Sequence, residues 1–192
     1  QRAGNGVERH GNAKTITDPH VWNSPVNVKV WVANIEKALS EADPADAAAF
    51  RANAEKYTKK LDELDAYAHS KFDKIADNSR KVLTSHDAFG YFGREYNVSF
   101  LAPLGLSTES EASAAEVAKL IEQIKQERVK TYFFENSNDP RLVKQVATAT
   151  GAKPGGELYV ESLSDTKGPA PTYEKMFRYN VDQLSAAMAK SS

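Results

Sequence analysis

Histidine and carboxylate side chains stand at the ends of several apolar segments of this 192-residue sequence. The segment "KVLTSH" ends on His86, "KTYFFEN" ends next to Glu135, and "GELYVES" ends next to Glu161. Imidazole nitrogens and carboxylate oxygens are donors that suit zinc, manganese or iron. Because the sequence has no cysteine, any metal must be held by nitrogen and oxygen donors. The spacing alone leaves a second interpretation open, since acidic residues at strand ends are also ordinary helix caps and turn formers.

The segments that carry these residues are predicted to be strands of an α/β fold. "KVLTSH", "VSFLAPLG", "KTYFFEN" and "GELYVES" are short and rich in strand-forming residues. Amphipathic stretches between and after them predict helices at about Ala88–Tyr96, Ala112–Arg128, Pro140–Thr150 and Thr172–Lys190. This alternation indicates a parallel sheet covered by helices on both faces. Ligands of such sheets bind at the carboxyl ends of the strands, where the candidate residues lie.

The first part of the chain has a different pattern. The opening "QRAGNGVERHGNAKTIT" is polar and rich in glycine and predicts a loop, and Ser24 and Pro25 then begin a short helix over about Val26–Ser40. Apolar residues at steps of three and four predict a long helix over Pro44–Asp77. Such a helix would span about 50 Å, which suits a connection between two lobes. An isolated domain rarely begins with such an opening loop, so we expect the chain to be a fragment whose start lies upstream.

Composition and motifs exclude several other functions. The formal net charge of −1 and the absence of a basic run argue against nucleic-acid binding. No apolar stretch approaches the length of about 18 residues that a membrane span needs. There is no phosphate-binding or dinucleotide-binding fingerprint, and the adjacent side chains of Ser85, His86 and Asp87 cannot all point inward to form a catalytic triad. We expect a binding protein and not an enzyme.

Four segments resemble, in the same order, the zinc- and manganese-binding solute-binding proteins of ABC transporters. They are "DPHVWNSP", "TSHDAFGYFGREYNV", "FFENSNDPRLVKQVATATGAK" and "LYVESLSDTKGPAPTYEKMFRYNV". The resemblance implies two α/β lobes joined by one rigid helix, with the metal between the lobes. It also implies a periplasmic or extracellular, membrane-associated protein that serves an ABC permease. On this basis residues 1–43 are the loop and last helix of an N-terminal lobe that is mostly missing, 44–78 the connecting helix and 79–192 the C-terminal lobe.

The resemblance also implies the metal ligands. His20 matches the histidine of the family's "DPH" segment, and His86 matches the ligand that follows "TS". Glu161 stands where the family has an aspartate in a "YxDS" segment, so this carboxylate is one methylene longer. Asp165 and Glu135 rank below these three, and Glu135 is expected to be a structural partner near the site. Three ligands leave a position for water, for His10 or for a histidine of the missing lobe.

Two imidazoles and one carboxylate favour Zn²⁺, with Mn²⁺ second. The expected function is therefore capture of a divalent transition metal ion and its delivery to the permease. Metal affinity should fall below about pH 6, because the histidines must lose protons to bind. The alternative is a truncated interaction module that binds no metal and self-associates through the surface that the missing lobe would cover.

Overall fold

A four-stranded parallel sheet forms the centre of the structure, a computed structural model that describes residues 7–10, 14–108 and 112–189. The strands are β3 (Lys81–Leu83), β4 (Ser99–Leu101), β5 (Thr131–Glu135) and β6 (Lys153–Leu158). Their order in the sheet is β4-β3-β5-β6, and every pair is parallel. The predicted α/β class with a parallel sheet is confirmed.

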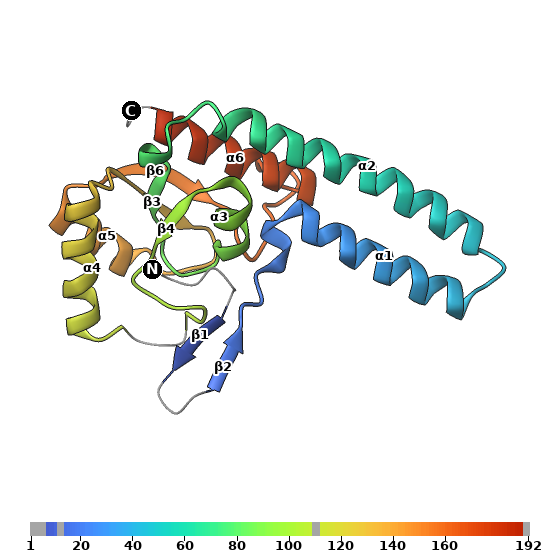
Figure 1. The fold of residues 1–192 in the computed structure, drawn as a ribbon, viewed down its shortest axis with the longest axis horizontal. Coiled ribbons are helices and arrows are strands. Elements are labelled where there is room, and N and C mark those ends of the chain that lie inside the picture. Colours follow the sequence, from blue (N-terminus) through green and yellow to red (C-terminus); the bar gives the residue numbers. More distant parts are fainter. Residues whose placement is uncertain (1–6, 11–13, 109–111, 190–192) are drawn as a thin grey trace.

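Helices cover both faces of this sheet (Figure 1). The bounds of the five helices involved are α2 Ala47–Phe72, α3 Gly90–Tyr96, α4 Ala114–Glu127, α5 Arg141–Thr150 and α6 Tyr173–Ala189. Val82 and Phe133 belong to the core shared with α2, α3 and α6, whereas Leu83 belongs to the core shared with α4 and α5. Successive side chains of a strand point to opposite faces, so Val82 and Leu83 of β3 are buried on opposite sides of the sheet.

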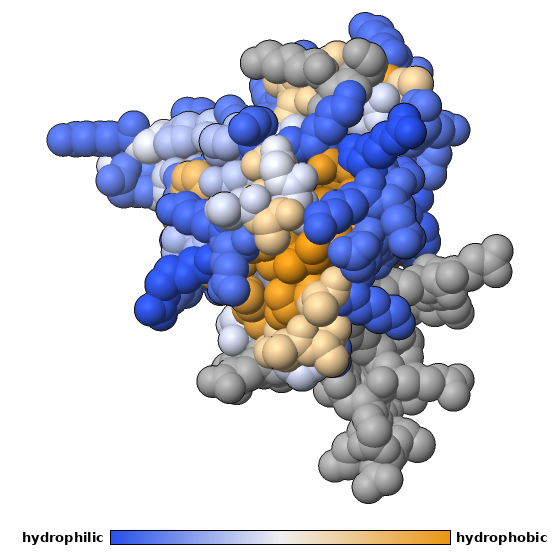
Figure 2. Space-filling model, turned by 90° about the vertical axis from the view of Figure 1, so that its left-hand side faces the viewer, coloured by the Kyte–Doolittle hydropathy of each residue, from blue (hydrophilic) through white to orange (hydrophobic). Residues whose placement is uncertain are grey.

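The α4 and α5 layer forms one side face of the molecule. Figure 2 shows that an apolar strip lies among hydrophilic residues on this face. The layer's half-buried apolar side chains include Val117, Leu120 and Ile121, which pack against the buried Ile124 and its neighbours. A capping box at Ser113 and Glu116 begins α4.

Helices α1 (Pro25–Ala42) and α2 form an antiparallel pair that projects from the sheet region (Figure 1). Ser24 caps α1, because its hydroxyl accepts the N–H of Asn27 at 3.4 Å, and Pro25 occupies the first helical position. The buried residues of α2 all lie in its second half, at Leu61, Leu64, Ala68 and Phe72. Its 26 residues span about 39 Å, shorter than the expected Pro44–Asp77 helix. None of the helices in the described ranges is long and apolar enough to cross a membrane.

The opening segment differs from the expected loop. Strands β1 (Val7–His10) and β2 (Lys14–Thr17) pair in antiparallel register, with Val7 opposite Thr17 and His10 opposite Lys14. The sequence-based prediction of a loop is wrong for these two short stretches. The residues "KTIT" include β-branched side chains, which are common in strands.

The boundaries of two sheet strands also differ from expectation. β3 ends at Leu83, and His86 forms only an isolated bridge with Leu104. β6 begins at Lys153, so it includes Pro154 and Gly155, and it ends at Leu158. Glu161 therefore lies in the loop after β6 instead of at the end of the strand itself.

Candidate metal site

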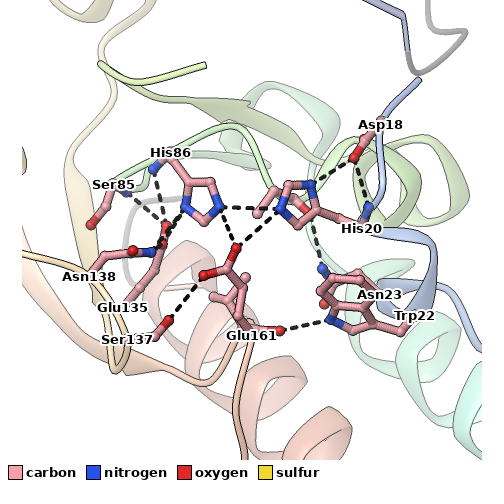
Figure 3. A network of polar contacts seen from close by, with 12 residues as sticks. Asp18, His20, Trp22, Asn23, Ser85, His86, Glu135, Ser137, Asn138 and Glu161 are labelled. Atoms are coloured by element: carbon pink, nitrogen blue, oxygen red, sulfur yellow. Dashed lines mark hydrogen bonds and ion pairs between the residues drawn. The ribbon is translucent and has the colours of Figure 1, made fainter. Parts of the chain in front are cut away.

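His86 is fully buried just beyond β3, and a buried glutamate fixes its ring (Figure 3). Oε2 of Glu135 lies 2.5 Å from Nδ1 of His86. Oε1 of Glu135 accepts the backbone N–H groups of Ser85 at 3.1 Å and His86 at 3.2 Å, and Asn138 donates to Oε2. Because a carboxylate can only accept, Nδ1 of His86 carries the hydrogen. The lone pair of Nε2 then faces the space between the sheet edge and residues 18–24.

His20 is held in the same way by Asp18. Oδ1 of Asp18 accepts the backbone N–H of His20 at 2.9 Å and lies 2.7 Å from its Nδ1. The 3-10 helix Val21–Asn23 follows directly. Within it, Trp22 donates its indole N–H to the carbonyl of Val160 at 2.8 Å, and Asn23 donates to the carbonyl of Ala88 at 2.9 Å. These two bonds fasten the His20 segment to the loop after β6 and to the chain before α3.

The two imidazoles and Glu161 meet at one point (Figure 3). The Nε2 atoms of His20 and His86 are 3.3 Å apart, and Oε1 of Glu161 is 3.5 Å from each of them. Oε2 of Glu161 accepts a hydrogen bond from the hydroxyl of Ser137 at 3.4 Å, so one carboxylate oxygen faces the histidines and the other faces Ser137. The Glu161 side chain is 38% exposed, whereas both imidazoles are buried.

The size of this triangle fits a small divalent ion. In a tetrahedral site the distance between two ligand atoms is about 1.6 times the metal–ligand bond, which is about 3.3–3.4 Å for zinc bonds of about 2.0–2.1 Å. The observed separations of 3.3 and 3.5 Å are close to this value. Carboxylates on the Nδ1 atoms of both histidines are the partners that metal-binding imidazoles ordinarily have.

The electrostatic environment affects the protonation of His86. Burial of the ring opposes the charged form, but the hydrogen bond and charge of Glu135, together with the charges of Glu161 and Asp87, outweigh burial and raise the pKa of His86. The raised pKa lets protons compete for Nε2 at a higher pH than at an ordinary histidine. At a pH near or below the pKa of His86, metal binding must therefore displace the proton from Nε2.

The lower-ranked candidates lie elsewhere. Glu135 contacts the Nδ1 side of His86 and not the triangle, in the supporting position expected for it. Asp165 is exposed, and its Oδ1 accepts the N–H groups of Lys167 and Gly168, so it closes a turn outside the group. His10 lies in β1, and its side chain is outside the described part of the structure.

Sequence reasoning missed the supporting residues Asp18, Trp22 and Asn138. A signal was present for Asp18, because an aspartate two residues before a histidine can bond that residue's backbone N–H in an Asx turn. No comparable local signal marks Trp22 and Asn138. Trp22 bonds the carbonyl of Val160, which is far away in the sequence, and Asn138 bonds the side chain of Glu135.

Comparisons with a family model and with individual known proteins point to the same family. Residues 2–187 match the family model described as "Zinc-uptake complex component A periplasmic". The iron-binding protein YfeA of Yersinia pestis is 35% identical over 177 residues, covering 92% of this chain and 57% of that protein. The manganese-binding lipoprotein MntA of Bacillus subtilis is 34% identical over 186 residues, covering 93% of this chain and 60% of that protein. The chain thus spans somewhat over half the length of these curated relatives.

Solved structures agree with the sequence matches. The periplasmic zinc-binding protein TroA from Treponema pallidum superposes with a TM-score of 0.86 at 30% identity, covering 95% of this chain and 67% of that one. A manganese-bound periplasmic metal-binding protein from Candidatus Liberibacter asiaticus, an S38A mutant, gives a TM-score of 0.87 at 29% identity, covering 96% and 68%. Curated relatives such as SsaB of Streptococcus sanguinis are substrate-binding proteins of ABC transporters and not enzymes, as the sequence predicts. The chain belongs to the zinc-uptake component A family of metal-binding, substrate-binding proteins of ABC transporters.

Proposed function

We propose that this chain captures a divalent transition metal ion through His20, His86 and Glu161. The observation that carries the proposal is the triangle of two Nε2 atoms and one carboxylate oxygen, with separations of 3.3, 3.5 and 3.5 Å. Two neutral imidazoles supply lone pairs, and the carboxylate supplies negative charge against the dication. A tetrahedral ion would have one further position for water or another donor.

Zinc is the proposed cargo, with manganese second. The relatives are named for iron, manganese or zinc, so the choice of metal rests on the donors of this chain. Two imidazoles with a single carboxylate and no sulfur favour zinc, whereas more oxygen donors would favour manganese. The orientation of Glu161 suits this choice, because Oε1 faces the imidazoles while Oε2 faces Ser137, as in binding through one carboxylate oxygen.

Delivery to an ABC permease is proposed from the relatives, one of which is named a metal ABC transporter substrate-binding lipoprotein. The same relatives support a periplasmic or extracellular, membrane-associated location. Helix α1 exposes large apolar side chains at Val30, Trp31, Ile35 and Leu39. An apolar face of this kind suits burial against another part of a larger protein. It supports a division in which residues 1–43 belong to a first lobe, 44–78 connect and 79–192 form the second lobe.

Calorimetry on chelator-stripped protein tests the proposal. We expect a high-affinity zinc-binding event, a weaker manganese-binding event, and loss of the high-affinity event in His86→Ala and in His20→Ala. Far-UV circular dichroism would verify that both variants are folded. An unchanged zinc isotherm in His86→Ala would refute the site. Absence of zinc binding, together with a metal-independent oligomer by size exclusion with light scattering, would instead support the self-association alternative.

A further inference from the structure

A second group of side chains that could bind a metal lies between α2 and α3, and it shares no residue with the site of His20, His86 and Glu161. Asp65 and His69 of α2 and Glu95 of α3 each offer one ligand atom, and these atoms all lie within 4.8 Å of one another. All three residues are half-buried. Asp65 and His69 are four residues apart, which places both side chains on one face of α2. Glu95 reaches this face from a different helix.

The orientation of His69 leaves one ring nitrogen directed at the group. Its Nδ1 lies 3.6 Å from Oδ2 of Asp73, and its Nε2 lies 3.9 Å from Oδ1 of Asp65. Asp73 thus lies on the Nδ1 side of the ring, but at 3.6 Å it is not hydrogen-bonded, unlike the carboxylates at 2.7 and 2.5 Å from the Nδ1 atoms of His20 and His86. The ring also packs edge-on against Tyr96, with centroids 5.1 Å apart.

Asp65 is held in place by a buried donor. The hydroxyl of Tyr96 donates to Oδ1 of Asp65 at 2.9 Å. Burial, with the charge and hydrogen bond of Asp65, raises the pKa of Tyr96, so this hydroxyl stays protonated and remains a donor. Tyr96 therefore holds Asp65 through Oδ1, the same oxygen that lies 3.9 Å from Nε2 of His69. An ionised carboxylate oxygen has two lone pairs, so it can accept this hydrogen bond and still bind a metal ion.

Among the described residues, neither Asp65 nor Glu95 forms an ion pair with a lysine or arginine. The nearby cations have other partners: Lys71 pairs with Asp182, and Arg94 lies over the ring of Tyr91. A salt-bridged helix face would account for Asp65, His69 and Asp73, but it would not account for the approach of Glu95 from α3. Two carboxylates and one imidazole brought together without a cation are a donor set that a divalent ion would neutralise.

From this arrangement we propose a second divalent-metal site formed by Asp65, His69 and Glu95, which takes zinc and joins α2 to α3. Three protein donors at a half-exposed position leave the remaining coordination to water. The second site should be weaker than the first, because its donors are less buried. Its occupation would tie α3, which leads away from His86, to the connecting helix.

Zinc retention after equilibrium dialysis, measured by elemental analysis, tests this site. The first group is removed with His20→Ala/His86→Ala, and this double variant should retain one zinc equivalent where the wild-type chain retains two. Adding Glu95→Gln or His69→Ala should weaken the retained binding by about tenfold or more. Glu63→Gln is the matched control, because Glu63 is an exposed residue of α2 outside the group and undergoes the same chemical change.

Zinc retention by Glu95→Gln in the otherwise wild-type chain is a second measurement, which does not depend on correct folding of the double variant. It should reduce retention from two equivalents to one and leave the high-affinity event unchanged. Zinc should also raise the melting temperature of the double variant, and Glu95→Gln should abolish this rise. The proposal is overturned if the wild-type chain retains a single equivalent, or if Glu95→Gln loses no more zinc than Glu63→Gln.

Discussion

Replacement of Glu135 by glutamine should weaken zinc binding although Glu135 does not reach the metal position. Oε1 of Glu135 accepts two backbone N–H groups, and Oε2 accepts Nδ1–H of His86. Glutamine offers one oxygen and one NH₂ group. If its oxygen stays on the backbone groups, its NH₂ faces Nδ1, and the imidazole must move its hydrogen to Nε2. The nitrogen that should bind the metal then has no free lone pair.

The opposite orientation of the amide is also unfavourable, because NH₂ would face the two backbone donors of Ser85 and His86 in a buried position. Changes to groups that orient a metal-binding histidine cost about 10–100-fold in affinity. This corresponds to about 1.4–2.7 kcal/mol of binding free energy. The loss of the Glu135 charge acts in the same direction, since it makes the imidazole a weaker donor.

Zinc titration calorimetry of Glu135→Gln and the wild-type chain would measure the effect, with Glu174→Gln as the matched control. Glu174 lies outside the site and forms an ion pair with Lys60 at 2.7 Å. The control should therefore leave zinc affinity unchanged. Near-ultraviolet circular dichroism would verify that the aromatic core is intact. If Glu135→Gln binds zinc within about twofold of the wild-type chain, a difference below about 0.5 kcal/mol, the tautomer argument is refuted.

Three further outcomes are expected. Zinc affinity should fall as the pH drops through the pKa of His86, which is raised from its ordinary 6.5. Calorimetry across pH 5.5–8.5 should therefore show the decline beginning above pH 6.5, a higher onset than the value of about pH 6 expected from the sequence alone. An onset below pH 6 would contradict the raised pKa. Ser137→Ala should change zinc affinity by less than about 0.5 kcal/mol, because its bond to Glu161 is long and exposed; a larger loss in the same titration would give Ser137 a stronger role. Phe92→Ala should lower the free energy of unfolding in urea by about 3–5 kcal/mol, since Phe92 is buried among five other aromatic rings. Leu163→Ala at an exposed position should change it by less than about 0.5 kcal/mol.

Periodicity predicted the helices of the C-terminal region closely. The amphipathic stretches expected at Ala112–Arg128 and Pro140–Thr150 agree with α4 and α5 to within two residues at each end. Local signals are strong there, because the capping box begins α4 and Gly151, with φ of 78°, ends α5. The helix ends are therefore determined by residues next to them in the sequence.

Strand boundaries depend on contacts that are distant in the sequence. β3 ends early because the carboxylate of Glu135 accepts the N–H groups of Ser85 and His86. β6 includes Gly155, where an added Cβ would lie 2.5 Å from the ring of Phe133 on the neighbouring strand. Pro154 and two glycines ordinarily indicate a turn, so no local pattern predicts a strand there.

The candidate ligands could be selected from the sequence only through the family resemblance. From spacing alone, His86 and Glu161 were two of several candidate residues near strand ends. Spacing did not predict that His20 lies next to them. The structure places the three together through the Trp22–Val160 and Asn23–Ala88 bonds, which join segments 138 and 65 residues apart. The spacing of four places Asp65 and His69 on one helix face, but no sequence signal brings Glu95 to them from another helix.

Pro154 has a consequence for the behaviour of the protein at high concentration. The N–H of Lys153 donates to the carbonyl of Lys130 in the direction of β5, so the nitrogen of Pro154 faces away from the sheet, on the open side of β6. A proline nitrogen carries no hydrogen, and another chain that docked there as an added strand would lack a donor at this place. The β6 edge of the sheet is thereby a poorer template for edge-to-edge aggregation at this position.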